Sequence, residues 1–201
     1  MTERLDAYIR SLPDGLESFP QYRAKASLVR MALEHRALSQ PVVEALPEPL
    51  RQLATNPPPA SSWVPEVHYC GFSLAVADAH EMSSDAFGEF WYAVSKSLTT
   101  SPLYAGLLAY LPPRILLRSA GLRWSAFHRG MGLRVRSRGP ELRLTLTFPP
   151  GLLPRLCAEG YTRAFAAIVD TSNAGAQMSL VEGGDDYAVY AMVVEENPDR
   201  A

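Results

Sequence analysis

"GLRVRSRGPELRLTLTF", residues 132–148, is the stretch of this chain that decides its fold class. Apolar and polar residues alternate along both arms, and the turn-forming letters Ser-Arg-Gly-Pro lie between them. A period of two residues is typical of strands with one buried face, so the stretch predicts a β-hairpin. Its inward residues are Leu133, Val135, Leu142, Leu144, Leu146 and Phe148, and its outward residues include Arg134, Arg136, Arg143, Thr145 and Thr147.

The periodicity changes on both sides of this hairpin. Downstream, residues 152–170 have helical spacing, and residues 175–196 predict a second hairpin that turns at Gly183 and Gly184. Upstream, helices are predicted at 2–12, 21–37, after Ser39, 66–81, 85–99 with Ser84 as N-cap, and 113–129. This order predicts an α+β fold, in which a helical N-terminal half is followed by an antiparallel sheet of about four strands built as hairpin, helix, hairpin.

The length of 201 residues and the 47% apolar content suit a single domain spanning residues 1–201. Within it we expect a helical segment at 1–60 with a proline-rich loop at 56–62, a helical core at 63–130, and the hairpin–helix–hairpin unit at 131–195. The net charge of −2 disfavours nucleic acid as a partner. Two cysteines, no signal-like start and no long apolar run predict a cytoplasmic protein without a membrane span.

The stretch "SSWVPEVHYCG", residues 61–71, gathers the polar letters that most suggest chemistry. On a helix, however, His68 and Cys70 would diverge by about 200°, so they do not form a ligand pair. We interpret the stretch as the start of a buried helix, with Trp63 and Val64 as an apolar staple before Pro65 and Glu66 in the first turn. No hydrolase, phosphate-loop or metalloprotease motif appears, and no catalytic residue is assigned.

The segment 114–143 is the most basic part of the chain, with eight arginines and one acid, Glu141. Such a patch can hold a small anion or an acidic protein surface, although its arginines can also simply pair with acids elsewhere in the fold. The aromatic segments 87–98 and 101–111 are candidates for the wall of an apolar pocket or for a dimer seam, although plain core packing also accounts for them. The resulting candidate binding residues are Arg114, Arg118, Arg134, Arg136, Arg143, Trp91 and Tyr104.

The order of elements resembles the superfamily of heme-nitric-oxide-binding, 4-vinyl-reductase-like and TRAPP domains. More closely, it resembles a poorly characterised bacterial family of similar length that is abundant in myxobacteria. The resemblance covers about residues 85–194 and rests on "FGEFWYAVSKSL", "LLRSAGLRWSAFHRG", "LRLTLTFPPGLLPRLCAEGYTRAFAAI" and "YAVYAMVV".

In the heme-binding branch, a histidine late in a helix ligates the iron, and a Tyr-x-Ser-x-Arg motif after the following strand holds the propionates. The resemblance places His128 of "WSAFHRG" at that histidine, whereas "TFPPGLLPR" lacks the tyrosine, serine and arginine in register. In the other branches the fold serves as a small-molecule sensor or a dimerising scaffold, usually without catalysis.

Two functions remain as hypotheses. The first is a non-catalytic cytoplasmic binding or protein-interaction module without a cofactor, a small-molecule sensor or scaffold with an apolar pocket and an arginine-rich rim. Its partner would be a small molecule or an acidic protein surface, and homodimerisation stays open. The alternative is a heme- or metal-binding sensor or enzyme that uses His128, or His68 with Cys70.

Overall fold

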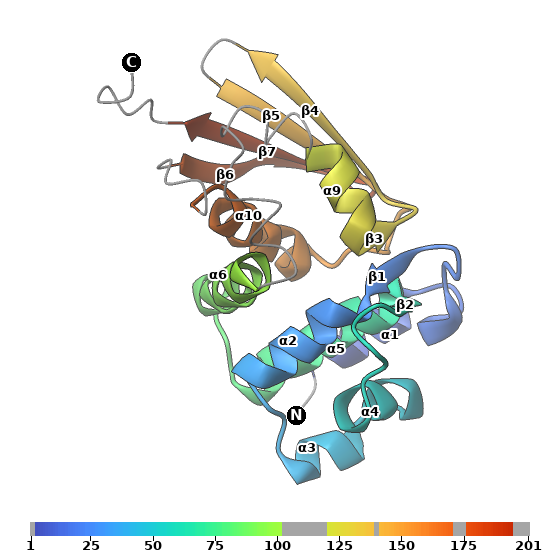
Figure 1. The fold of residues 1–201 in the computed structure, drawn as a ribbon. Helices are drawn as coiled ribbons and strands as arrows, with labels where there is room; N and C mark the ends of the chain where they lie inside the picture. Colours follow the sequence, from blue (N-terminus) through green and yellow to red (C-terminus); the bar gives the residue numbers. More distant parts are fainter. Residues whose placement is uncertain (1–2, 102–119, 139–140, 171–175, 195–201) are drawn as a thin grey trace.

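The computed structural model describes residues 3–101, 120–138, 141–170 and 176–194. A helical N-terminal half precedes a sheet-rich C-terminal part, so the predicted α+β class is confirmed (Figure 1). The N-terminal helices are α1 (Glu3–Ser11), the short 3-10 turn η1 (Gly15–Glu17), α2 (Ala26–His35), α3 (Gln40–Ala45), α4 (Glu48–Thr55), α5 (Glu66–Ala79) and α6 (Ser84–Thr100). They are followed by α9 (Ala120–Phe127) and, between the two hairpins, α10 (Arg155–Asp170).

Helix α5 is the centre of the helical half. Almost all of its residues are buried, because α1, α4 and α10 surround it. The apolar residues of α5 are spread around the whole helix and not along one stripe, which is typical of a helix that is buried on all sides. Helix α6 begins one residue earlier than predicted. Its cap is Ser83, whose Oγ accepts the backbone N–H of Ala86, while Ser84 donates instead to Glu159 of α10.

The C-terminal part is a four-stranded antiparallel sheet of two hairpins. Its strands are β4 (Gly132–Arg138), β5 (Glu141–Thr147), β6 (Ala176–Gly183) and β7 (Tyr187–Val194), in the spatial order β4-β5-β7-β6. Leu144 and Leu146 are buried on the inner face, while Arg134 and Arg136 are exposed on the outer one, as the alternation predicted. Helix α10 packs between this sheet and α6, and the hydroxyl of Tyr190 donates to the Ala158 carbonyl.

A second, three-stranded sheet lies where the two halves meet (Figure 1), and the sequence did not predict it. Its strands are β1 (Arg23–Lys25), β2 (Trp63–Pro65) and β3 (His128–Arg129), in the order β2-β1-β3. Three predictions were therefore wrong. The helix predicted from 21 begins at Ala26, residues 63–65 form a strand rather than a staple, and the helix predicted to 129 ends at Phe127. Strands of two or three residues are too short to show the alternation of apolar and polar residues from which a strand is predicted. Their partners are also far away in the sequence.

Within the described residues, no helix combines the length and the apolar character that crossing a membrane requires.

Candidate functional site

His128 is the first residue of β3, and its side chain points into the core. Only 3% of the residue is exposed, and none of Glu66 is. Nδ1 of His128 lies 2.9 Å and 3.1 Å from the two carboxylate oxygens of Glu66, 62 residues away in the chain. A buried carboxylate needs such a partner, because an unpaired charge in a core is strongly destabilising.

The three-stranded sheet brings these two side chains together. Ala24 in the middle strand pairs with Val64 on one side and with His128 on the other, so the imidazole shares the inward face of the sheet. Glu66 follows β2 directly as the first residue of α5, and its backbone N–H donates to the Tyr22 carbonyl just before β1. The same ladder therefore fixes both members of the pair.

Aromatic rings enclose the imidazole. The indole of Trp124 from α9 stacks on it, with ring centroids 4.1 Å apart and an angle of 16° between the planes. Tyr69 from α5 and Tyr161 from α10 each approach it edge-on with a centroid distance of 5.7 Å. We call His128, Glu66, Tyr69, Trp124 and Tyr161 the His128 cage.

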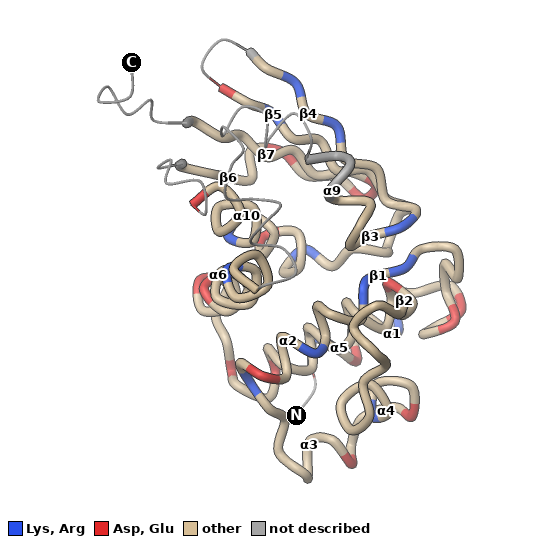
Figure 2. The backbone as a smooth tube through the Cα atoms, in the orientation of Figure 1, with Lys and Arg blue, Asp and Glu red and all other residues tan. Residues whose placement is uncertain are grey.

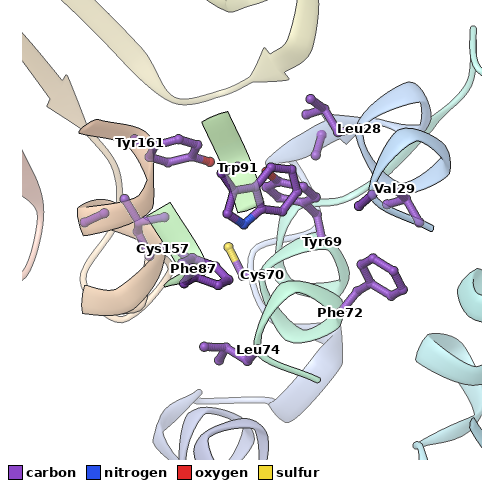
Figure 3. Close-up of a cluster of buried hydrophobic side chains, with 14 of the residues drawn as sticks. Leu28, Val29, Tyr69, Cys70, Phe72, Leu74, Phe87, Trp91, Cys157 and Tyr161 are labelled. Carbon is purple, nitrogen blue, oxygen red and sulfur yellow. The ribbon is translucent and has the colours of Figure 1, made fainter. Parts of the chain in front are cut away.

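A second layer continues the cage toward α6. Trp91 packs against Tyr69 with ring centroids 5.4 Å apart. Figure 3 shows the Tyr161 ring pointing from α10 toward Trp91, with Cys70 of α5 below them. The predicted site residue Trp91 therefore belongs to this buried cluster.

The phenols of Tyr69 and Tyr161 and the thiol of Cys70 are held in their neutral forms. Burial raises the pKa of Tyr69 and of Tyr161 well above the ordinary value for tyrosine. The neighbouring Cys157 thiol and burial raise the pKa of Cys70 in the same direction. A protonated thiol is a poor nucleophile, so Cys70 is not set up for covalent catalysis.

Two polar atoms of the cage have no hydrogen-bond partner among the described residues. They are Nε1 of Trp124 and the hydroxyl oxygen of Tyr161, and both are buried. Leaving a buried donor unsatisfied costs roughly 1–3 kcal/mol, and such groups in native proteins call for an explanation. Since both belong to rings in contact with His128, a ligand with polar atoms at this position would satisfy them.

The other predicted site residues lie apart from the cage. His68 is on the far side of α5 from Cys70, with Nε2 at 3.1 Å from the Leu16 carbonyl oxygen, so the helix separates the two as expected. The arginines of the first hairpin lie on the outer sheet face, and Arg143 pairs there with Glu141 at 2.6 Å. Their role in binding stays a prediction. Arg114, Arg118 and Tyr104 lie outside the described residues.

No metal-binding cluster is found in the part of the chain that the structure describes, since no three His, Cys, Asp or Glu side chains converge there. A groove of about 490 Å³ lies between the β6–β7 turn and the start of α10, lined by Phe148, Leu153, Arg155 and Tyr187 among others. No member of the His128 cage lines that groove.

Sequence reasoning missed Glu66, Tyr69, Trp124 and Tyr161 as partners of His128. One signal was present: Glu66 begins an otherwise apolar helix that was predicted to be buried. A buried glutamate requires a partner, and His128 was one of only four histidines that could provide an imidazole.

The fold has counterparts among solved structures. An Fe(II) unliganded H-NOX protein variant from K. algicida has a TM-score of 0.59 and 11% identity, over 88% of this chain and 100% of that chain. An oxygen-binding H-NOX domain related to soluble guanylate cyclases gives 0.56 and 9%, over 85% and 92%. An H-NOX structure concerned with heme distortion gives 0.58 and 9%, over 85% and 93%.

At these identities the likeness shows the fold alone, which is H-NOX-like. No model of a protein family matches the chain, and neither does any curated protein. The resemblance to the heme-nitric-oxide-binding superfamily is thus confirmed at the level of fold. Membership in the myxobacterial family, and any likeness to the other branches of the superfamily, stay predictions.

Proposed function

We propose that this protein is a sensor module that binds a small molecule at His128, and that heme is the first ligand to test. The observation that carries the proposal is the His128 cage, a buried His–Glu pair ringed by aromatic side chains with two unpaired donors, inside an H-NOX-like fold. The proposal favours the ligand-binding alternative from the sequence over a module without a cofactor.

The donor chemistry of the cage fits an axial ligand. Histidines that bind metals usually donate their other ring N–H to a carboxylate, which fixes the tautomer and raises the basicity of the ligating nitrogen. In the neutral tautomer whose Nδ1–H donates to Glu66, Nε2 of His128 would carry the lone pair that a metal requires. The rings of Trp124, Tyr69 and Tyr161 supply an apolar surround that keeps water away.

The sequence lacks the Tyr-x-Ser-x-Arg motif that would hold the propionates of a heme, because no tyrosine in the chain begins such a motif. This chain would therefore rely on His128 and on apolar contact more than on charged anchoring. Bound heme iron would supply a position for a diatomic gas. The chain itself would orient the imidazole through Glu66 and exclude water through the aromatic rings.

Reconstitution with hemin tests the proposal directly. We expect the purified protein to gain a Soret band and to lose it in His128→Ala, while His35→Ala retains it because His35 is exposed and bonded to Ser97. Because His128→Ala can misfold, circular dichroism and imidazole rescue of the band accompany the spectrum. A protein that stays colourless, or a band equally strong in folded His128→Ala, would remove heme at His128 from consideration.

A second candidate is a protein-interaction module, as the sequence first suggested. The observation in its favour is exposed positive charge. Arg134 and Arg136 form no ion pair within the described residues, and Arg136 lies opposite Arg143 across the ladder. The two candidates are compatible, because a sensor needs an output surface.

A further inference from the structure

The outer face of the three-stranded sheet is cationic. Its inward residues are Ala24, Val64 and His128, so the alternate positions of the same strands face solvent. These positions carry Arg23 and Lys25 on the middle strand, Trp63 on β2 and Arg129 on β3. We call Arg23, Lys25, Trp63 and Arg129 the basic face. Figure 2 shows the basic residues gathered at β1 and β3.

Trp63 holds two of these cations on one ring. Nζ of Lys25 lies 4.2 Å from the ring centroid, and the guanidinium carbon of Arg129 lies 4.0 Å from it. Because β1 separates β2 from β3, the side chains of Trp63 and Arg129 meet across the middle strand. A cation over the face of an indole is attracted by the electron density of the ring, so Trp63 offsets part of the repulsion between the two charges.

The remaining repulsion is not neutralised by acids. Arg23 stands directly opposite Arg129 in the ladder, an arrangement of like charges that destabilises a sheet. Among the described residues, none of Arg23, Lys25 and Arg129 forms an ion pair, and Lys25 donates only to the Ser61 carbonyl.

Other arginines of the described chain do have acidic partners. They are Arg4 with Asp78, Arg51 with Glu48, Arg143 with Glu141, Arg155 with Glu159 and Arg163 with Glu89. Arg10, Arg30, Arg36, Arg134 and Arg136 also have no ion pair among the described residues, so what distinguishes the basic face is that two of its cations share one tryptophan ring. Three neighbouring cations without an ion pair among the described residues, two of them on one indole, have the composition of a recognition surface, since Trp and Arg dominate binding energy at interfaces.

We propose that the basic face binds an acidic, extended segment of a partner protein. Arg23 and Lys25 occupy positions i and i+2 of a strand, about 7 Å apart. Carboxylates at alternate positions of an extended peptide have the same spacing, so two of them can face these two cations while a third faces Arg129. Nucleic acid fits less well, because Lys25 and Arg129 already occupy the Trp63 ring on which a base would stack.

The basic face also lies next to the His128 cage. In β3, His128 points inward and the following residue, Arg129, points outward. A ligand that moves His128 therefore moves Arg129 through one peptide unit. This coupling rests on the function proposed above, whereas binding of the acidic segment does not, so either can fail without the other.

The test uses the full chain and a fluorescein-labelled decapeptide of alternating glutamate and serine. We expect fluorescence anisotropy to show salt-sensitive binding that weakens about tenfold or more in Arg23→Gln/Lys25→Gln/Arg129→Gln, because three exposed ion pairs are removed. The matched control is Arg10→Gln/Arg30→Gln/Arg36→Gln, which removes the same charge from exposed positions in the helical N-terminal half. It should bind as the unmodified protein does, and circular dichroism checks that both variants fold.

Three outcomes would overturn the proposal. The first is that the peptide does not bind the unmodified protein. The second is that the two triple variants lose affinity equally, which indicates a general charge effect. The third is a single-stranded oligonucleotide of equal charge that binds the same face as tightly as the peptide, which shows that the partner class is wrong.

Discussion

The two sheets of this protein are built in opposite ways. The four-stranded sheet consists of two local hairpins with strands of seven or eight residues, and its inner face is a continuous apolar layer against α10. The three-stranded sheet joins segments around residues 24, 64 and 128, with strands of two or three residues. Short strands bury little area, so the small sheet depends on what surrounds it.

The large sheet mainly contributes to the stability of the fold, whereas the small sheet mainly positions functional side chains. The large sheet can be stabilised by apolar area, which is tolerant of detail. The small sheet contributes few ladder bonds, yet it carries His128 on its inner face and the basic face on its outer one. Its integrity should therefore depend on a few specific contacts, above all the Glu66–His128 pair.

Breaking that pair should produce the largest effect. We expect Glu66→Ala to lower the free energy of unfolding by about 3–5 kcal/mol, because it removes one partner of a buried polar pair and leaves the imidazole unmatched. Urea unfolding measures the change. The double variant Glu66→Leu/His128→Leu should recover a large part of the loss, because it leaves no polar group unpaired. A loss below about 1 kcal/mol for Glu66→Ala would show that the pair does not stabilise the small sheet.

A substitution at Gly130, between β3 of the small sheet and β4 of the large sheet, should have a smaller effect on the free energy of unfolding. Gly130 follows β3 with φ of +90°, and a Cβ there would lie 2.7 Å from Cδ1 of Tyr22. Gly130→Ala therefore combines backbone strain with a steric clash, and we expect a loss of about 2–4 kcal/mol in urea unfolding. Gly151 beyond β5 is the matched control, with φ of +83° and nothing within 4 Å of its Cβ position. Gly151→Ala should cost about 1–2 kcal/mol, and equal losses would mean that Tyr22 yields freely.

The same contrast explains what the sequence could predict. The large sheet was predictable because Leu144 and Leu146 alternate with polar residues over a stretch long enough to show a period of two. The small sheet was not, since a strand such as His128–Arg129 has no period to detect and forms only when distant segments meet. The candidate site shares this limit: His128 could be singled out, but its pairing with Glu66 is a consequence of the small sheet.

A substitution of His68 should have the smallest effect on stability, and it tests the helical half without touching the small sheet. Burial holds its pKa below the ordinary value of 6.5, although the Leu16 carbonyl and Glu17 partly oppose the shift. The folded protein therefore binds fewer protons at His68 than the unfolded chain does, and stability rises with pH in this range. This contribution is fully present above pH 6.5 and is lost as the pH falls through the lowered pKa of the folded state.

We expect His68→Gln to flatten the dependence of the free energy of unfolding on pH between 5.5 and 7.5, as followed by urea unfolding at several pH values. His35→Gln, at an exposed histidine, should leave the slope unchanged. If His68→Gln retains the full slope, the group whose protonation weakens the protein is not His68. If the slope disappears, acid weakens the protein through His68, which lies about 200° from Glu66 around the same helix.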